Sequence, residues 1–100
     1  MKVKRFKHEF VLTYFLKDID EIDLEEEFLN HFKEYAKKKD LSVRFQETGS
    51  GYCKNGMRDI SYYLSSTHPW KFKELFRNMR RYLQRRKFQK IQFEILKEDD

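Results

Sequence analysis

The chain has 100 residues, a length typical of one domain, and 39% of them are charged. Its ten Phe, six Tyr and one Trp exclude a disordered chain, because disordered chains lack the large side chains whose burial offsets the entropy of ordering. The net charge of +5 makes nucleic acid or another anionic surface the default partner, and the single cysteine excludes an intrachain disulfide.

A basic arm and a strand open the chain. The arm, 1–7, has no apolar pattern, whereas His8–Leu16 is apolar on both parities and rich in β-branched and aromatic residues. This two-sided pattern favours a strand at the centre of a sheet.

A helix is predicted after this strand. Asp23 and Glu26 have the spacing of a capping box, and acidic residues crowd the first turn, where the helix dipole favours them. We expect the helix to end near Lys39, because lysines in a last turn match the same dipole. Its apolar stripe consists of Leu24, Phe28, Phe32, Tyr35 and Ala36.

The middle of the chain predicts two strands joined by a turn. The first strand, Leu41–Glu47, alternates between apolar and polar residues. Thr48–Tyr52 contains two glycines and is predicted as a turn, with a second turn signal at Lys54–Gly56. The next strand is expected over Met57–Ser66. The expected core residues of the strand Leu41–Glu47 are Leu41, Val43 and Phe45.

The last third of the chain predicts a second helix and a final strand. Thr67–Trp70 is typical of a helix start, with Pro69 in the first turn, and the helix is expected to end near Arg86. Lys90–Leu96 alternates as a strand and precedes a charged tail, 97–100. The apolar stripe of this helix consists of Phe72, Leu75, Phe76, Met79, Tyr82 and Leu83.

The predicted order of elements is βαββαβ. This order is that of the ferredoxin-like α+β fold, in which a four-stranded antiparallel sheet carries two helices on one face. The first and third strands are central in that topology, which agrees with the two-sided pattern of the first strand. We therefore predict one ferredoxin-like domain over residues 1–100.

The main candidate site is the outer side of the second predicted helix. Lys71–Lys90 holds nine basic residues and one acid, Glu74. Like charges four residues apart on a helix cost a few tenths of a kcal/mol each. A run of one sign therefore indicates an anion-binding surface rather than only a solvated helix face. Arginine also pairs bidentately with phosphate. The predicted RNA contacts are Lys73, Arg77, Arg80, Arg81, Arg85 and Arg86, with secondary contacts from Lys4, Arg5, Gly49, Ser50, Gly51 and Tyr52.

Other kinds of site have weaker support in the sequence. The glycine-rich stretch lacks the lysine and serine or threonine of a phosphate-binding loop, and its glycines are explained by a turn. The open sheet face is expected to carry Val11, Thr13, Phe15 and Tyr63, but the aromatic and glycine spacing of RNA-recognition modules is missing. Three histidines and one cysteine have no zinc spacing, and no catalytic arrangement is recognisable. We expect no enzymatic activity, no metal and no cofactor.

Several short motifs resemble the YggL family of small bacterial proteins associated with the large ribosomal subunit. Phe45–Tyr52, which reads F-Q-E-T-G-S-G-Y, is similar to the F-x-G-S-G-Y hairpin of that family. The similarity continues through Gly56, Thr67 and Tyr82–Phe88, the last resembling the family's W-L-x-x-R-x-L helix end. The family's Arg-rich N-terminal segment is abbreviated here, and Leu96–Asp100 replaces its aromatic and acidic C-terminus. The resemblance implies ribosome binding and no catalytic residues.

Two hypotheses on function follow from these patterns. The first is a non-enzymatic RNA- or ribosome-binding protein that uses the basic helix. The second is a protein-interaction module or inhibitor, for example phage-borne, that binds an acidic protein surface or pairs as a homodimer through a sheet edge. The acidic segment Asp18–Glu27, with seven acids and no base, supports the second hypothesis. Because no apolar stretch is long enough for a membrane span or a signal peptide, we expect a cytoplasmic protein and no membrane partner. We also expect no small-molecule substrate.

Overall fold

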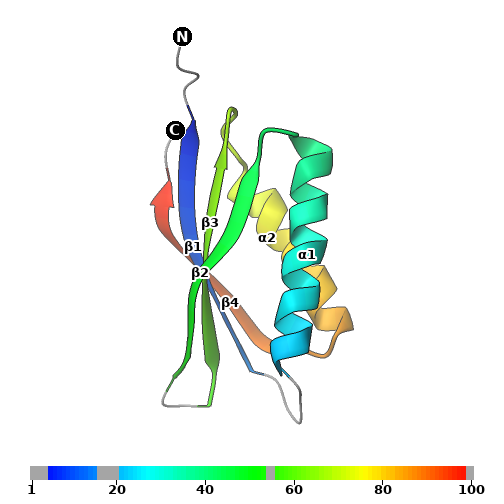
Figure 1. Ribbon diagram of the computed structural model, residues 1–100. Coiled ribbons are helices and arrows are strands. Elements are labelled where there is room, and N and C mark those ends of the chain that lie inside the picture. The colour runs from blue at the N-terminus through cyan, green and yellow to red at the C-terminus, as the bar shows by residue number, and fades with distance from the viewer. Residues whose placement is uncertain (1–4, 16–20, 54–55, 99–100) are drawn as a thin grey trace.

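The computed structural model describes residues 5–15, 21–53 and 56–98, which form four strands and two helices in the order βαββαβ (Figure 1). This order and the antiparallel pairing of the strands confirm the predicted ferredoxin-like α+β fold. No helix in these ranges is long and apolar enough to cross a membrane. The elements are β1 (Phe6–Phe15), α1 (Glu21–Lys39), β2 (Arg44–Tyr52), β3 (Arg58–Ser66), α2 (Phe72–Arg85) and β4 (Gln89–Glu98).

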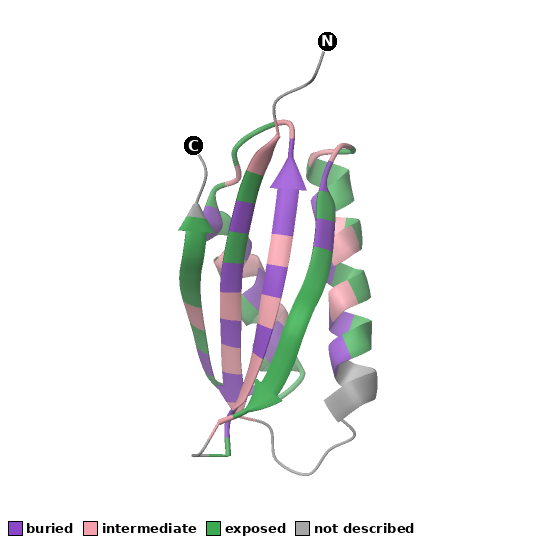
Figure 2. Ribbon diagram, turned by 60° about the vertical axis from the view of Figure 1, so that its left-hand side comes forward, coloured by how far each residue is buried: buried purple, intermediate pink, exposed green. Residues whose placement is uncertain are grey.

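The strands form one sheet in the order β2-β3-β1-β4, so β1 and β3 are central, as predicted. Both helices cover the same face of the sheet, with α1 over β2 and α2 over β4 (Figure 1). In β1, Phe10 and Tyr14 are buried beneath the helices, whereas Val11 and Phe15 are half-buried on the open face. Figure 2 shows this alternation along both central strands, while much of the surface of the edge strands is exposed.

Aromatic rings fill much of the space between the sheet and the helices. The ring centroid of Phe10 lies 5.1 Å from that of Phe76 in α2 and 5.4 Å from that of Tyr62 in β3. The Phe28 ring of α1 contacts the same Tyr62 ring at 5.8 Å. Each such pair adds about 0.5–1.5 kcal/mol beyond the area it buries. The predicted stripe residues that are buried are Phe28, Phe32, Ala36, Phe72, Leu75, Met79 and Leu83, and those half-buried are Tyr35, Phe76 and Tyr82.

Ion pairs join the two helices at opposite ends. Where α1 ends and α2 begins, Lys39 Nζ lies 3.0 Å from Glu74 Oε1. At the other end, the Arg86 guanidinium that follows α2 pairs with Glu27 near the start of α1. The helices are therefore antiparallel neighbours, and the side of α2 that faces away from the sheet is held in a defined orientation.

The glycine-rich stretch predicted as a turn is part of a strand. Thr48–Tyr52 belongs to β2 and pairs with β3, with a register shift between Glu47 and Gly49. The chain turns instead after Cys53, where the Cys53 N–H donates to Met57 O at 2.7 Å. This is the place of the second turn signal, of which residues 54–55 lie outside the described residues, and Gly56 has the positive φ of 80° that such a turn requires.

Two element ends also differ from the prediction. Leu41, expected in the core, is 91% exposed, because α1 is followed by a turn in which the Ser42 N–H donates to Asp40 Oδ1 at 2.8 Å. Pro69, expected in the first turn of the second helix, lies before α2, which begins at Phe72. The residues between β3 and α2 therefore form an irregular connection, which lines the pocket described below.

Candidate nucleic-acid interface

The side of α2 that faces away from the sheet carries a row of positive charge. Four exposed residues recur there at helical spacing: Lys73, Arg77, Arg81 and Arg85, which we call the basic face. Within the part of the chain that the structure describes, none of the four donates a hydrogen bond or forms an ion pair. Their guanidinium and ammonium groups are thus available to an external anion. The buried residues Phe72, Leu75, Met79 and Leu83 hold the opposite side of the helix against the core.

Two of the predicted contact residues are engaged by the protein itself. Arg80 Nη1 donates to Ile91 O at 3.0 Å, and its guanidinium carbon lies 5.6 Å from the centre of the Phe93 ring of β4. Arg86 pairs with Glu27, and its guanidinium lies 5.4 Å from the centre of the Tyr82 ring. These two arginines flank the basic face and anchor α2 to β4 and to α1. The guanidinium groups of Arg80 and Arg86 are therefore less available to an external anion than the side chains of the basic face.

Glu74 is the one acidic residue on α2, and its charge is matched locally. Its carboxylate accepts a hydrogen bond from Lys39, which lowers the pKa of Glu74, and nearby Lys71 and Arg77 lower it further. The same hydrogen bond raises the pKa of Lys39. Both groups stay ionised near neutral pH, so Glu74 joins the helices without reversing the sign of the basic face.

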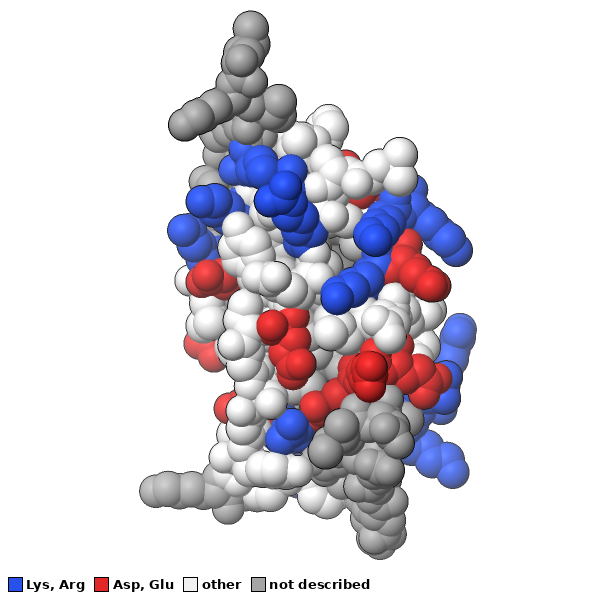
Figure 3. All heavy atoms as spheres, viewed as in Figure 1, with Lys and Arg blue, Asp and Glu red and all other residues white. Residues whose placement is uncertain are grey.

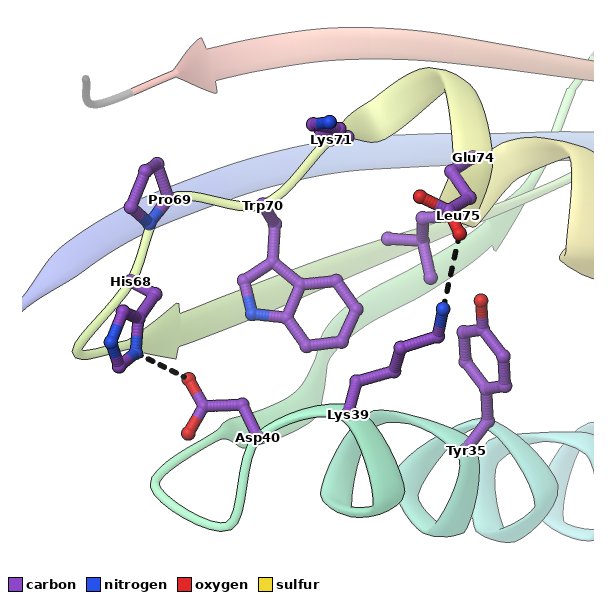
Figure 4. Close-up of a pocket in the computed structure, with 9 residues that line it drawn as sticks. All are labelled: Tyr35, Lys39, Asp40, His68, Pro69, Trp70, Lys71, Glu74 and Leu75. Carbon is purple, nitrogen blue, oxygen red and sulfur yellow. Dashed lines mark hydrogen bonds and ion pairs between the residues drawn. The ribbon is translucent and has the colours of Figure 1, made fainter.

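A pocket of about 380 Å³ opens where α1 ends and α2 begins (Figure 4). The indole of Trp70, from the connection before α2, projects toward α1, and the Lys39 side chain and the Tyr35 ring lie across from it. Trp70 is half-buried and packs against the core. No pattern named above predicts this pocket, and the one signal of it in the sequence is a single Trp directly after the only Pro.

A hydrogen-bonded network fixes the walls of this pocket. Asp40 Oδ1 accepts hydrogen bonds from Ser42 N at 2.8 Å and Ser42 Oγ at 2.6 Å, which lowers the pKa of Asp40. Thr67 N donates to Ser42 Oγ at 3.1 Å, and His68 Nδ1 lies 3.5 Å from Asp40 Oδ2. The turn after α1 is thus joined to the connection before α2, and the position of Trp70 is set from both sides.

The structure does not bring the predicted secondary contacts to the basic face. Arg5 donates to Ser42 O at 2.7 Å and to Ser65 O at 3.2 Å, so its guanidinium joins the start of β1 to two neighbouring segments. Lys4 lies outside the described residues. Gly49, Ser50, Gly51 and Tyr52 belong to β2, the edge strand opposite the one that α2 covers.

Part of the acidic segment Asp18–Glu27 forms hydrogen bonds and ion pairs with other residues of the chain. Glu25 is buried and accepts hydrogen bonds from the Tyr14 hydroxyl and from two nitrogens of Arg58, one of them at 3.1 Å. The Arg58 guanidinium also lies 4.7 Å from the centre of the exposed Tyr52 ring. The hydrogen bond to Glu25 raises the pKa of Arg58. Asp18 and Asp20 lie outside the described residues.

Charge is unevenly distributed over the surface. On the side formed by α1 and β2, acidic side chains occupy the middle, and basic side chains lie at the upper end and along one edge (Figure 3).

The open face of the sheet carries the expected Val11, Thr13, Phe15 and Tyr63, all half-buried. Thr13 there donates to Asp59 Oδ1 at 2.8 Å, and the Lys90 ammonium lies 5.7 Å from the centre of the Phe15 ring.

Comparison with known proteins adds no assignment. No protein-family model matches the chain, and a search of curated proteins found no similar sequence. Among the residues that the structure describes, no three His, Cys, Asp or Glu side chains are grouped in a way that could hold a metal ion. The geometry of the residues is therefore the basis for the functional proposal.

Proposed function

We propose that this protein is a non-enzymatic RNA-binding protein whose principal contact surface is the basic face of α2. The observation that carries the proposal is that Lys73, Arg77, Arg81 and Arg85 are exposed side by side without partners among the described residues. A polyanion would relieve the mutual repulsion of these charges and would release counterions on binding.

The spacing of the basic face fits a phosphate backbone. Arg77, Arg81 and Arg85 succeed one another every four residues, which places them about 6 Å apart along the helix axis at 1.5 Å per residue. This distance is close to that between neighbouring phosphates of an extended single strand, so one strand can contact several of the arginines in turn. Arginine also supports bidentate contacts that orient a phosphate.

The ribosome is the proposed source of this RNA. The basis is the resemblance of Phe45–Tyr52 and of the end of α2 to the YggL family of large-subunit-associated proteins. The stretch that carries the first of these similarities lies on β2, at the opposite edge of the sheet from β4, which α2 covers. A protein with two such surfaces would contact ribosomal RNA through α2 and present β2 to a second component.

A protein-interaction module remains the second candidate, and one observation favours it. The edge strand β4 exposes Ile95 and Leu96, which are 44% and 55% accessible, and an exposed edge can pair with a strand of another chain. The acidic segment supports this candidate less than its sequence suggests, because Glu25 and Glu27 bind Arg58 and Arg86 of the same chain.

Capture of a tagged chain from cell lysate, with and without RNase, separates the two candidates. We expect ribosomal RNA and large-subunit proteins to be captured at low salt and to be lost after RNase treatment. The combined variant Arg77→Gln, Arg81→Gln and Arg85→Gln should greatly reduce this capture, because it removes three cations without changing helix propensity.

The matched control removes the same charge from the open side of the sheet. Lys7→Gln, Arg44→Gln and Lys97→Gln replace three exposed basic residues of β1, β2 and β4, and this variant should capture RNA as the wild type does. Capture of one protein that survives RNase and the α2 substitutions would contradict RNA binding and favour the interaction module.

A further inference from the structure

The Trp70 pocket and the basic face form one continuous surface. Lys71 and Glu74 line the pocket, and they also line a shallow depression of about 300 Å³ whose other walls are Lys73 and Arg77. A ligand that fills the pocket therefore extends directly onto the first residues of the basic face. An aromatic wall and a row of cations are thus adjacent at the start of α2.

The walls of the pocket suit a flat, hydrogen-bonding ring. Trp70 and Tyr35 supply aromatic surface, the Lys39 side chain lies between them with its ammonium 5.6 Å from the centre of the Tyr35 ring, and Leu75 adds an apolar side chain to the lining (Figure 4). The Asp40 and Glu74 carboxylates accept hydrogen bonds, and ammonium groups of lysine donate them. A pocket of about 380 Å³ lies within the size range of small-molecule sites and is open to solvent on one side. A nucleobase has this combination of a stacking surface and polar edges.

We propose that the Trp70 pocket binds an unstacked base of single-stranded RNA, while the adjoining phosphates lie on Lys71, Lys73 and Arg77. The inference rests on the proposed function and adds to it a preference for single strands. In a duplex the bases are stacked and paired, so none can enter the pocket, whereas the phosphates of a duplex can still reach the basic face. The pocket therefore converts a general attraction for polyanions into selection of unpaired RNA.

Trp70 is the only tryptophan, so its intrinsic fluorescence reports directly on this pocket. The full chain is titrated with a single-stranded RNA of about 12 nucleotides, with the same strand paired into a duplex, and with a strand of the same length made of abasic ribose phosphates. Affinity is measured independently from the anisotropy of an end label. We expect the base-carrying single strand to quench Trp70 and to bind about tenfold more tightly than the abasic strand.

Two variants test whether the preference arises in the pocket. Trp70→Leu should remove the tenfold preference for bases, and Tyr35→Leu should weaken both the preference and the quenching while keeping the fluorophore. Tyr63→Leu is the matched control, because Tyr63 is a half-buried aromatic on the open face of the sheet, and it should retain the full preference. Urea unfolding of each variant shows that it is folded at the temperature of the titration.

The possible failures are distinguishable. Equal affinity for base-carrying and abasic strands, with no change in Trp70 fluorescence, would refute the pocket proposal and leave the basic face as the RNA-binding surface. An absence of binding to all three nucleic acids would refute the proposed function as well. Quenching by duplex and single strand alike would show that the pocket responds to phosphate and would also overturn the base-binding role.

Discussion

At the residue scale, Glu25 is a buried acid whose carboxylate is held by hydrogen bonds within the protein. Its carboxylate contacts the Tyr14 hydroxyl and Arg58, and the side chains of Glu25 and Arg58 are only 10% and 13% exposed. We expect Glu25→Ala to lower the free energy of unfolding by about 2–4 kcal/mol, because a buried ion pair loses one partner and the other stays desolvated. Urea unfolding measures this change.

The neighbouring Glu26 provides the control for this experiment. It is exposed and belongs to the same turn of α1, so Glu26→Ala should change the free energy of unfolding by no more than about 0.5 kcal/mol. If the two variants were equally stable, Glu25 would be a surface residue in solution and its contacts with Tyr14 and Arg58 would be without consequence.

The pKa of Glu47 is raised in the folded protein, whereas an ion pair lowers the pKa of an acid. Ionisation of Glu47 therefore lowers the free energy of unfolding as the pH rises. Partial desolvation of its largely exposed carboxyl raises the pKa of Glu47, the negative charge of Glu25 raises it further, and Arg58 lowers it. The folded state therefore holds this proton more tightly than the unfolded chain, so the ionised group destabilises the fold above the folded-state pKa and has no such effect below the unfolded-state pKa.

We accordingly expect Glu47→Gln to stabilise the protein at neutral pH. The gain should be about 0.5 kcal/mol or less, because the residue is exposed at the edge of the sheet, and it should disappear as the pH falls below about 4. Urea unfolding of both proteins across this pH range measures the difference. A gain that is the same at every pH would show that packing, not ionisation, is responsible.

At the element scale, the end of α2 combines a standard helix cap with an unfavourable residue. The Phe88 N–H donates to Leu83 O at 3.0 Å and the Lys87 N–H to Gln84 O at 3.0 Å, which is the Schellman pattern. The position that usually holds glycine is occupied by Lys87, whose φ is 66°. The cap is therefore formed at the cost of a strained lysine.

Lys87→Gly should relieve this strain. We expect it to raise the free energy of unfolding by about 0.5–1 kcal/mol, because glycine adopts positive φ without a steric cost. Arg81→Gly, in the middle of the same helix, should lower it by about 1 kcal/mol. Thermal or urea unfolding of both variants gives the comparison, and destabilisation by Lys87→Gly would contradict the left-handed conformation at this residue.

The elements themselves could be predicted from the sequence because their apolar periods are strong. The two-sided pattern of β1 predicts a central strand, and the 3.6-residue stripe of α2 predicts a helix. The structure confirms both. The glycine-rich stretch could not be assigned in this way. Gly49 and Gly51 have no side chains to alternate, and the register shift after Glu47 hides the period of a strand whose last seven residues are exposed.

The candidate site was predictable only in part for a related reason. The periodicity of α2 identifies which arginines lie on its outer side, but it does not identify those bound by distant residues. Arg80 binds Ile91 O, and Arg86 binds Glu27, 59 positions away in the sequence. The Trp70 pocket likewise requires the turn after α1 to meet the connection before α2, a tertiary contact with no local pattern.

At the scale of the whole molecule, the two sides of the sheet differ in what they offer a polyanion. The helix side presents the basic face as a continuous row, whereas the open side mixes exposed Lys7, Arg44 and Lys97 with acidic neighbours such as Glu9 and Glu94. Both sides contribute to the net charge of +5, but only a row of adjacent cations can neutralise successive phosphates. Binding should therefore depend on where the charge lies rather than on its sum.

The salt dependence of RNA affinity tests this dependence on position. If four to six phosphates of a single strand are neutralised, a plot of log affinity against log salt concentration should have a slope of about −3 to −4. The variant Arg77→Gln, Arg81→Gln and Arg85→Gln should reduce the magnitude of that slope by about 2, at about 0.7 for each phosphate that is no longer neutralised. The variant Lys7→Gln, Arg44→Gln and Lys97→Gln has the same net charge and should keep the wild-type slope. Equal reductions in the two variants would mean that RNA responds to the overall charge of the molecule, and α2 would then have no special role in binding.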